Sequence, residues 1–93
     1  MRNVKTESDY IVSYDIADNR RLQRLAKQLE KVGIRIQFSV FLLCAFKPSE
    51  IYDTIETIKS VIDENEDDVR VYRVRDAGLS IGQAIDIADP YVF

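Results

Sequence analysis

The alternation of apolar and polar residues predicts a β-strand near the N-terminus. Over residues 10–16, successive side chains fall into two sets, as they do on the two faces of a strand. Both sets contain apolar residues, which indicates a sheet that is covered on both faces. One set consists of Tyr10, Val12, Tyr14 and Ile16, and the other consists of Ile11, Ser13 and Asp15.

Two amphipathic helices are predicted further along the chain. The first covers residues 19–32, with Asp18 placed to cap its start and Gly33 placed to end it. The second follows a turn and cap at residues 47–50 and ends in the acidic segment 63–68, which is expected to be a solvated loop. The apolar stripes are Leu22, Leu25, Ala26, Leu29 and Val32 in the first helix, and Ile51, Ile55, Ile58 and Ile62 in the second.

The remaining apolar segments predict the other strands. The run 34–46 is too long for one strand of about five or six residues, so we expect it to bend into two. Residues 69–74 form a further strand, and a short one is expected at 84–87.

The order β-α-β-β-α-β predicts an α+β, ferredoxin-like fold: a four-stranded antiparallel sheet with two helices on one face. The whole chain, residues 1–93, is expected to form one domain, with a core over about 8–75 and a tail over 76–93. The other face of the sheet needs a cover, and a second copy of the chain is the simplest candidate.

The amino-acid composition restricts the kinds of metal and catalytic site that the chain can form. The chain contains no histidine, which excludes Cys/His zinc sites and His-based triads and leaves a hard cation held by carboxylates, such as Mg²⁺ or Mn²⁺. The one cysteine, Cys44, lies in an apolar run and is expected to be buried. No apolar run reaches about 18 residues and no secretory signal is present, so we expect a soluble, cytoplasmic protein.

Charge is distributed unevenly along the chain. Residues 1–47 carry nine basic and five acidic side chains, whereas residues 48–93 carry four basic and eleven acidic ones. In the first predicted helix, the face opposite the leucines is basic. It carries Arg20, Arg24, Lys27 and Lys31, with Arg21 at its shoulder.

Two interpretations of this basic stripe stay open. It is either an ordinary solvated face or a binding surface for the phosphates of a nucleic acid. Like charges four residues apart, as in Arg20 and Arg24, cost about 0.2–0.5 kcal/mol per pair, and a bound polyanion would offset that cost.

Asp15 also has two interpretations. Near the end of the first predicted strand, it is placed either to form a turn with the backbone that follows or to serve as a ligand. If its face of the sheet meets a second protomer, a two-fold axis would bring two copies of Asp15 together. Two carboxylates about 4 Å apart repel by roughly 4 kcal/mol at an effective dielectric of 20, and a divalent cation would relieve that repulsion.

Residues 14–41, YDIADNRRLQRLAKQLEKVGIRIQFSVF, resemble the first half of the Cas-two family, the smaller proteins of CRISPR spacer acquisition. The resemblance lies in a strand ending in Y-D-I, a basic helix, and the pattern R-x-Q-x-S-V-F. VRVYRV, residues 69–74, is similar to the fourth strand of that family, so that the resemblance covers about residues 8–75.

The resemblance implies a ferredoxin-like homodimer with Asp15 as the metal ligand. It implies a metal-dependent endonuclease acting on RNA or DNA, or the non-catalytic bridge of a complex with the CRISPR integrase, in which the dimer holds duplex DNA. Ser39 would orient water or phosphate, or would simply bond to backbone. Many members carry an acidic or polar residue directly after S-V-F, where this chain has Leu42.

Three interpretations of the function therefore stay open. The protein is a nuclease, an adaptor that binds nucleic acid without catalysing a reaction, or, with less support, a small-molecule regulatory or RNA-recognition domain on the same fold. No glycine-rich loop follows the first strand, and the aromatic pattern of an RNA-recognition motif is absent from the fourth.

Overall fold

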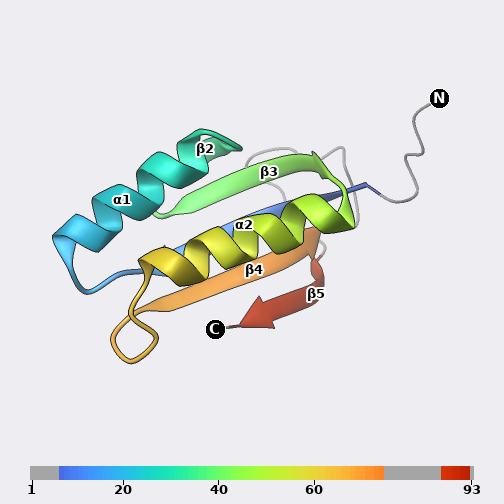
Figure 1. Cartoon of the computed structure of the whole chain (residues 1–93). Helices are drawn as coiled ribbons and strands as arrows, with labels where there is room; N and C mark the ends of the chain where they lie inside the picture. Colours follow the sequence, from blue (N-terminus) through green and yellow to red (C-terminus); the bar gives the residue numbers. More distant parts are fainter. Residues whose placement is uncertain (1–6, 75–86, 93) are drawn as a thin grey trace.

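The computed structural model describes residues 7–74 and, by their backbone, 87–92 (Figure 1). The elements are β1 (Ser8–Asp15), α1 (Asn19–Glu30), β2 (Ile34–Gln37), β3 (Val40–Phe46), α2 (Pro48–Val61), β4 (Asp68–Val74) and β5 (Ile87–Val92). All strands pair antiparallel in the order β2-β3-β1-β4-β5. The first four strands and the two helices confirm the ferredoxin-like prediction.

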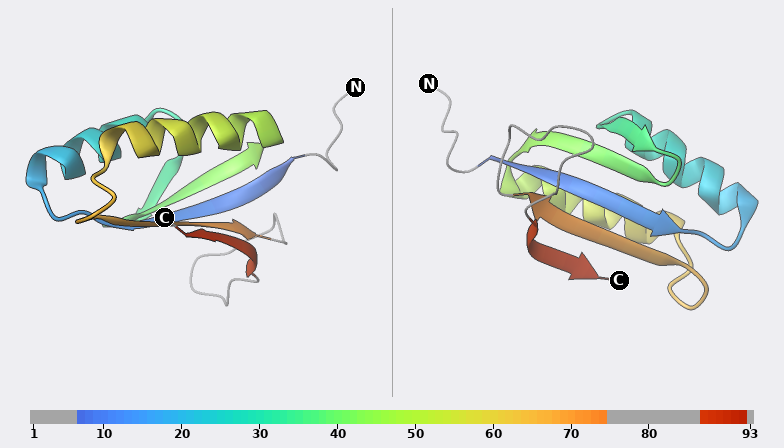
Figure 2. Two further views of the ribbon diagram at one scale, coloured as in Figure 1. Left: turned by 60° about the horizontal axis from the view of Figure 1, so that its bottom comes forward. Right: turned by 180° about the vertical axis from the view of Figure 1, so that it is seen from behind.

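Both helices cover the same face of the sheet, and none of the described residues forms a helix on the opposite face (Figure 2). Tyr10, Val12 and Tyr14 point into the helical layer and are buried there, as their alternation predicts. The core consists of these three residues together with Leu25, Leu29, Phe41, Leu43, Phe46, Ile51, Ile55, Ile58, Val61, Val69 and Val71. Neither helix is long and apolar enough to cross a membrane.

The bend expected within the apolar run 34–46 is confirmed at Phe38 and Ser39, which form the turn between β2 and β3. The predicted end of the first helix is wrong by two residues. Helix α1 ends at Glu30, and Val32 lies in the following turn with 43% of its surface exposed.

Gly33 ends α1 for a different reason than the sequence suggests. Its N–H donates to the Leu29 carbonyl at 2.8 Å, but its φ lies outside the left-handed region. A Cβ at this position would lie 2.5 Å from Leu43 Cδ2 and 2.7 Å from the Leu42 carbonyl oxygen. The position therefore requires glycine because the chain passes directly against β3.

Replacing Gly33 with alanine is expected to lower the free energy of unfolding by about 1–3 kcal/mol, the usual cost of overpacking. The Leu43 methyl can rotate away, but the Leu42 carbonyl belongs to the sheet backbone and cannot move without disturbing β3. Urea denaturation of the variant and the wild type measures the difference. An unchanged midpoint would contradict the close approach.

The short C-terminal strand predicted at 84–87 is described only at Ile87, which lies in a strand. Strand β5 runs from Ile87 to Val92, and residues 84–86 lie outside the described residues. Strand β5 lies at the edge of the described sheet next to β4, and edge strands are where proline, which cannot donate a hydrogen bond to a neighbouring strand, is tolerated.

The prediction that Cys44 is buried is wrong, since its side chain is exposed. In β3, Phe41 and Leu43 face the helices, so Cys44 falls on the opposite face together with Leu42. A bulge follows, in which Ala45 adopts a left-handed backbone with φ of 55°. The buried carboxylate of Asp9 accepts the Ala45 N–H at 2.8 Å and stabilises this bend.

Candidate nucleic-acid interface

Asp15 is the last residue of β1 and is exposed on the sheet face that lacks helices. Its cross-strand neighbour in β4 is Asp68, so the structure brings together two carboxylates that the sequence separates by more than fifty positions. Like charges in this position destabilise a sheet. Arg70 offsets part of that cost, because its Nε donates to Asp68 Oδ2 at 3.2 Å.

The turn that follows β1 is held by other aspartates than Asp15. Asp18 accepts the Arg21 N–H at 3.0 Å, which confirms it as the N-cap of α1. The Ala17 N–H donates to Asp67 at 2.9 Å. Among residues 7–74, no hydrogen bond engages the carboxylate of Asp15, so the turn interpretation loses its support.

Asp15 and Asp68 fit a divalent cation only in part. Their oxygens are ligands of the kind that Mg²⁺ prefers, and Mg²⁺ commonly keeps several waters beside one or two carboxylates. Within residues 7–74, however, no group of three or more acidic or cysteine side chains is arranged to hold a metal. A complete site would need donors from outside one protomer.

The basic face of α1 is present as predicted. Arg20, Arg24 and Lys27 are exposed on the helix, and Lys31 is exposed at its C-cap. In the part of the chain with described side chains, no carboxylate forms an ion pair with any of these four cations. Together they form what we call the cationic stripe: Arg20, Arg24, Lys27 and Lys31.

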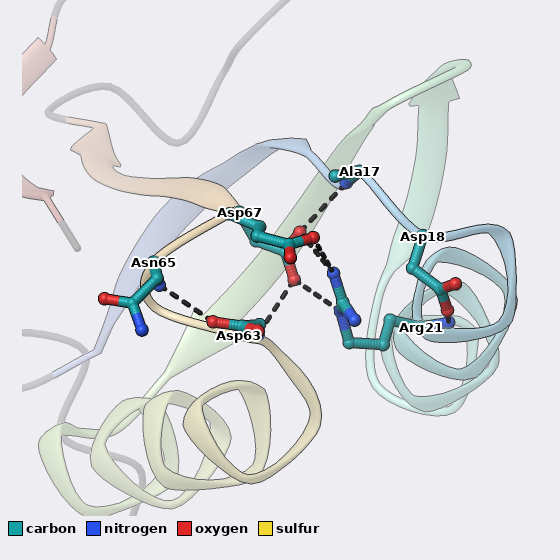
Figure 3. Close-up of polar contacts among 7 residues, drawn as sticks. Ala17, Asp18, Arg21, Asp63, Asn65 and Asp67 are labelled. Atoms are coloured by element: carbon teal, nitrogen blue, oxygen red, sulfur yellow. Dashed lines mark hydrogen bonds and ion pairs between the residues drawn. The ribbon is translucent and has the colours of Figure 1, made fainter.

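Arg21 differs from the cationic stripe because its guanidinium is held by the α2–β4 loop (Figure 3). Its Nε lies 2.8 Å from Asp67 Oδ2, and one of its terminal nitrogens lies 3.3 Å from Glu66 Oε2. These hydrogen bonds, that to Asp67 above all, raise the pKa of Arg21. The predicted contact between Arg21 and nucleic acid stays untested, and the structure gives this side chain another role.

Asp67 corrects the prediction that residues 63–68 form a solvated loop. Its side chain is fully inaccessible to solvent, and it accepts hydrogen bonds from the Ala17 N–H, the Asp63 N–H at 2.8 Å and Arg21. The hydrogen bond from Arg21 is the main reason why the pKa of Asp67 falls to about 2. We call this set, Ala17, Arg21, Asp63 and Asp67, the loop clasp.

The β2–β3 turn lies beside the end of β1. The Tyr14 N–H donates to the Ser39 carbonyl at 3.1 Å, which ties the turn to the residue before Asp15. Phe38, in the same turn, is the most exposed large apolar residue of the described chain, at 81%. The sequence pattern does not single out Phe38, because this residue lies inside an apolar run that predicts strands.

The structure separates the two predicted groups of site residues. Successive residues of a strand point to opposite faces, so Asp15 lies on the sheet face away from Tyr14 and the helices. The cationic stripe is exposed on α1, on the side of the helix opposite the buried Leu25 and Leu29. Within one protomer, the carboxylates and the cationic stripe therefore occupy different surfaces.

Comparison with known proteins assigns the family. Residues 8–80 match the family described as CRISPR associated protein Cas2. The chain belongs to the Cas2 family. This confirms the resemblance seen in the sequence over about residues 8–75.

Individual Cas2 relatives are similar over most of the chain. The protein named CRISPR-associated endoribonuclease Cas2 1, from Nitrosomonas europaea, is 42% identical over 72 residues, which cover 77% of this chain and 68% of the relative. The crystal structure of the hypothetical protein TT1823 from Thermus thermophilus matches with a TM-score of 0.71 and 31% identity, over 85% of this chain and 98% of that one. Streptococcus pyogenes Cas2 matches with a TM-score of 0.62 and 33% identity, over 69% of this chain and 82% of that one.

Proposed function

We propose that the protein acts in CRISPR adaptation as a homodimer that binds nucleic acid, duplex DNA or RNA, and bridges the CRISPR integrase. The cationic stripe carries this proposal. Four exposed cations without a carboxylate partner among the described side chains, on one side of a helix in a protein with net charge −3, are an arrangement suited to phosphates.

A homodimer is supported by the sheet face that lacks helices. Leu42 and Val40 lie on that face and are only partly buried, and Cys44 is exposed there. A second copy placed against this face would cover these residues and leave the cationic stripes on the outside. Because membership of the Cas2 family already accounts for the fold, the third alternative, a small-molecule regulatory domain, is not needed to explain it.

Salt dependence tests the binding of nucleic acid. If each protomer makes about four phosphate contacts, the slope of log K against log salt for duplex DNA is expected to be near −7 for the dimer, taking about 0.9 per contact. The double replacement Arg24→Ala with Lys27→Ala removes two contacts per protomer and is expected to bring the slope to roughly half that value. Fluorescence anisotropy over a salt series measures both slopes.

Lys47→Ala provides the matched control for that experiment. Lys47 is an exposed cation outside α1, at the start of α2, so its loss changes the net charge but not the cationic stripe. Its slope is expected to equal that of the wild type. A flat salt response of the wild type, or equal effects of the two replacements, would contradict the proposed interface.

A second candidate function is metal-dependent endonuclease activity at Asp15, supported by its exposed carboxylate and by the neighbouring Asp68. Mg²⁺ or Mn²⁺ bound there would lower the pKa of a water molecule and stabilise negative charge on the scissile phosphate. Asp15 and its symmetry mate would supply the protein ligands. Ser39, which is tied to the end of β1 through its backbone, would orient phosphate or water.

A further inference from the structure

A hollow between α1 and the β2–β3 turn combines aromatic, amide and guanidinium groups. Its volume is about 200 Å³. It is lined by Tyr14, Asn19, Leu22, Gln23, Ala26, Arg35 and Phe38. Sites for drug-sized ligands have about 300–1,000 Å³, so this hollow suits a single ring system rather than a complete cofactor.

Phe38 does not belong to the hydrophobic core that the described residues form. It is 81% exposed, so it contributes little to the core. Its position in a tight turn normally favours Gly, Pro, Asn, Asp or Ser, which adopt turn conformations or bond to the turn backbone. A large ring held out at the rim of a hollow is instead suited to stacking on another flat ring.

The walls of the hollow carry groups that recognise flat, polar rings. Asn19 and Gln23 each offer both hydrogen-bond donors and acceptors. The Arg35 guanidinium is held in place from two sides, by Glu30 at 3.2 Å and by the ring of Phe41, whose centroid lies 5.1 Å from its central carbon. Burial raises the pKa of Tyr14, so its phenol stays protonated.

The hollow continues into the cationic stripe. Gln23 lines both this hollow and a second one formed with Arg20, Arg24 and Lys27. A ring placed against Phe38 would thus be joined, within a short distance along α1, to a surface that binds phosphates. This neighbourhood favours a nucleotide over an apolar peptide or a second copy of the chain.

We infer that this hollow binds an unpaired nucleobase, stacked on Phe38 and contacted by Asn19, Gln23 or Arg35, while the adjoining phosphates lie on the cationic stripe. The inference rests on the proposed binding of nucleic acid, and it adds that part of the bound strand is single. Stacking of a base on an aromatic side chain contributes about 1–3 kcal/mol, which corresponds to a change of about 5- to 150-fold in affinity.

Two probes with the same phosphates separate stacking from charge. A short oligothymidylate is compared with an abasic strand of equal length, each titrated into the intact wild-type protein. The wild type is expected to bind the oligothymidylate more tightly. Phe38→Ala is expected to weaken binding of the oligothymidylate by about 5- to 150-fold while leaving the affinity for the abasic strand and the salt slope unchanged, and Phe38→Tyr should retain stacking.

Tyr52→Ala is the matched control, because Tyr52 is an aromatic side chain that is 61% exposed on α2, away from the hollow. It is expected to bind both probes as the wild type does. If the wild type binds both strands equally in a salt-dependent way, the base site is overturned and the proposed interface stands. If neither strand binds, both the base site and the proposed nucleic-acid interface are overturned. If Phe38→Ala instead weakens self-association and leaves both affinities unchanged, the hollow contacts a second copy and the inference is overturned.

Discussion

Replacing Asp15 with alanine is expected to reduce metal-dependent cleavage of nucleic acid by roughly 100-fold or more, the scale on which one electrostatic contribution to the transition state acts. The exposed carboxylate lies at the end of β1, where no described residue engages it in a hydrogen bond. Its removal deprives the proposed site of its main ligand. Cleavage of a labelled substrate with and without Mg²⁺ measures the effect.

The Tm measured with and without Mg²⁺ tests metal binding at Asp15 independently of cleavage activity. Mg²⁺ is expected to raise the Tm of the wild type, since a ligand that binds only the folded state stabilises it, and to leave the Tm of Asp15→Ala unchanged. Asp53→Ala is the control, because Asp53 is an exposed aspartate on α2. Sedimentation of the wild type and of each variant shows whether the proposed dimer forms and persists. Full cleavage by an intact Asp15→Ala dimer would place the activity at another site or in a contaminant.

Replacing Asp67 with asparagine is expected to lower the free energy of unfolding by about 3 kcal/mol, and the Tm by roughly 15 °C. Each carboxylate oxygen of Asp67 faces two donors: Oδ1 faces the Ala17 N–H and Arg21, and Oδ2 faces the Asp63 N–H and Arg21. Whichever way the asparagine amide is turned, its NH₂ group meets two donors in a site closed to solvent. Urea and thermal denaturation measure the loss.

Glu66→Ala is the matched control for the loop clasp. Glu66 contacts the same arginine at 3.3 Å, but its side chain is 59% exposed, and exposed pairs contribute about 0–1 kcal/mol. If Asp67→Asn loses no more stability than Glu66→Ala, about 0–1 kcal/mol, the segment 63–68 behaves as the solvated loop that the sequence suggests.

The pH dependence of the loop clasp has a defined sign. Because the folded pKa of Asp67, about 2, lies below its usual value, the carboxylate stabilises the fold above about pH 4, and this contribution is lost as the pH falls from about 4 to about 2. Asp67→Asn is expected to lack this component. The difference in Tm between wild type and variant should therefore shrink in that window.

The loop clasp also bears on the proposed site. Asp67 accepts a hydrogen bond from the backbone N–H of Ala17, two residues after Asp15. It also binds the guanidinium of Arg21, the residue that follows Arg20 of the cationic stripe. The same buried carboxylate therefore sets the path of the chain between the end of β1 and the first turn of α1. A weakened clasp would disturb both candidate surfaces at once.

Local pattern was enough to determine the types and order of the first six elements, the bend in the run 34–46, and the faces of β1 and α1. These features depend on the spacing of neighbouring residues, which has a period near two in strands and near 3.6 in helices. The cationic stripe and the position of Asp15 at a strand end followed from the same information, and so did the resemblance to the Cas2 family, which matches residues 8–80.

Only the tertiary structure determined which acidic and aromatic side chains become buried, paired or exposed at a candidate site. Asp67 becomes buried through a hydrogen bond to Ala17, 50 positions away, and Asp68 becomes the neighbour of Asp15 through the register of β1 and β4. Cys44 is exposed because only one of two apolar faces receives the helices. Local spacing carries no information on such pairings, because the free energy of burying a charge or a ring depends on partners that only the folded chain brings together.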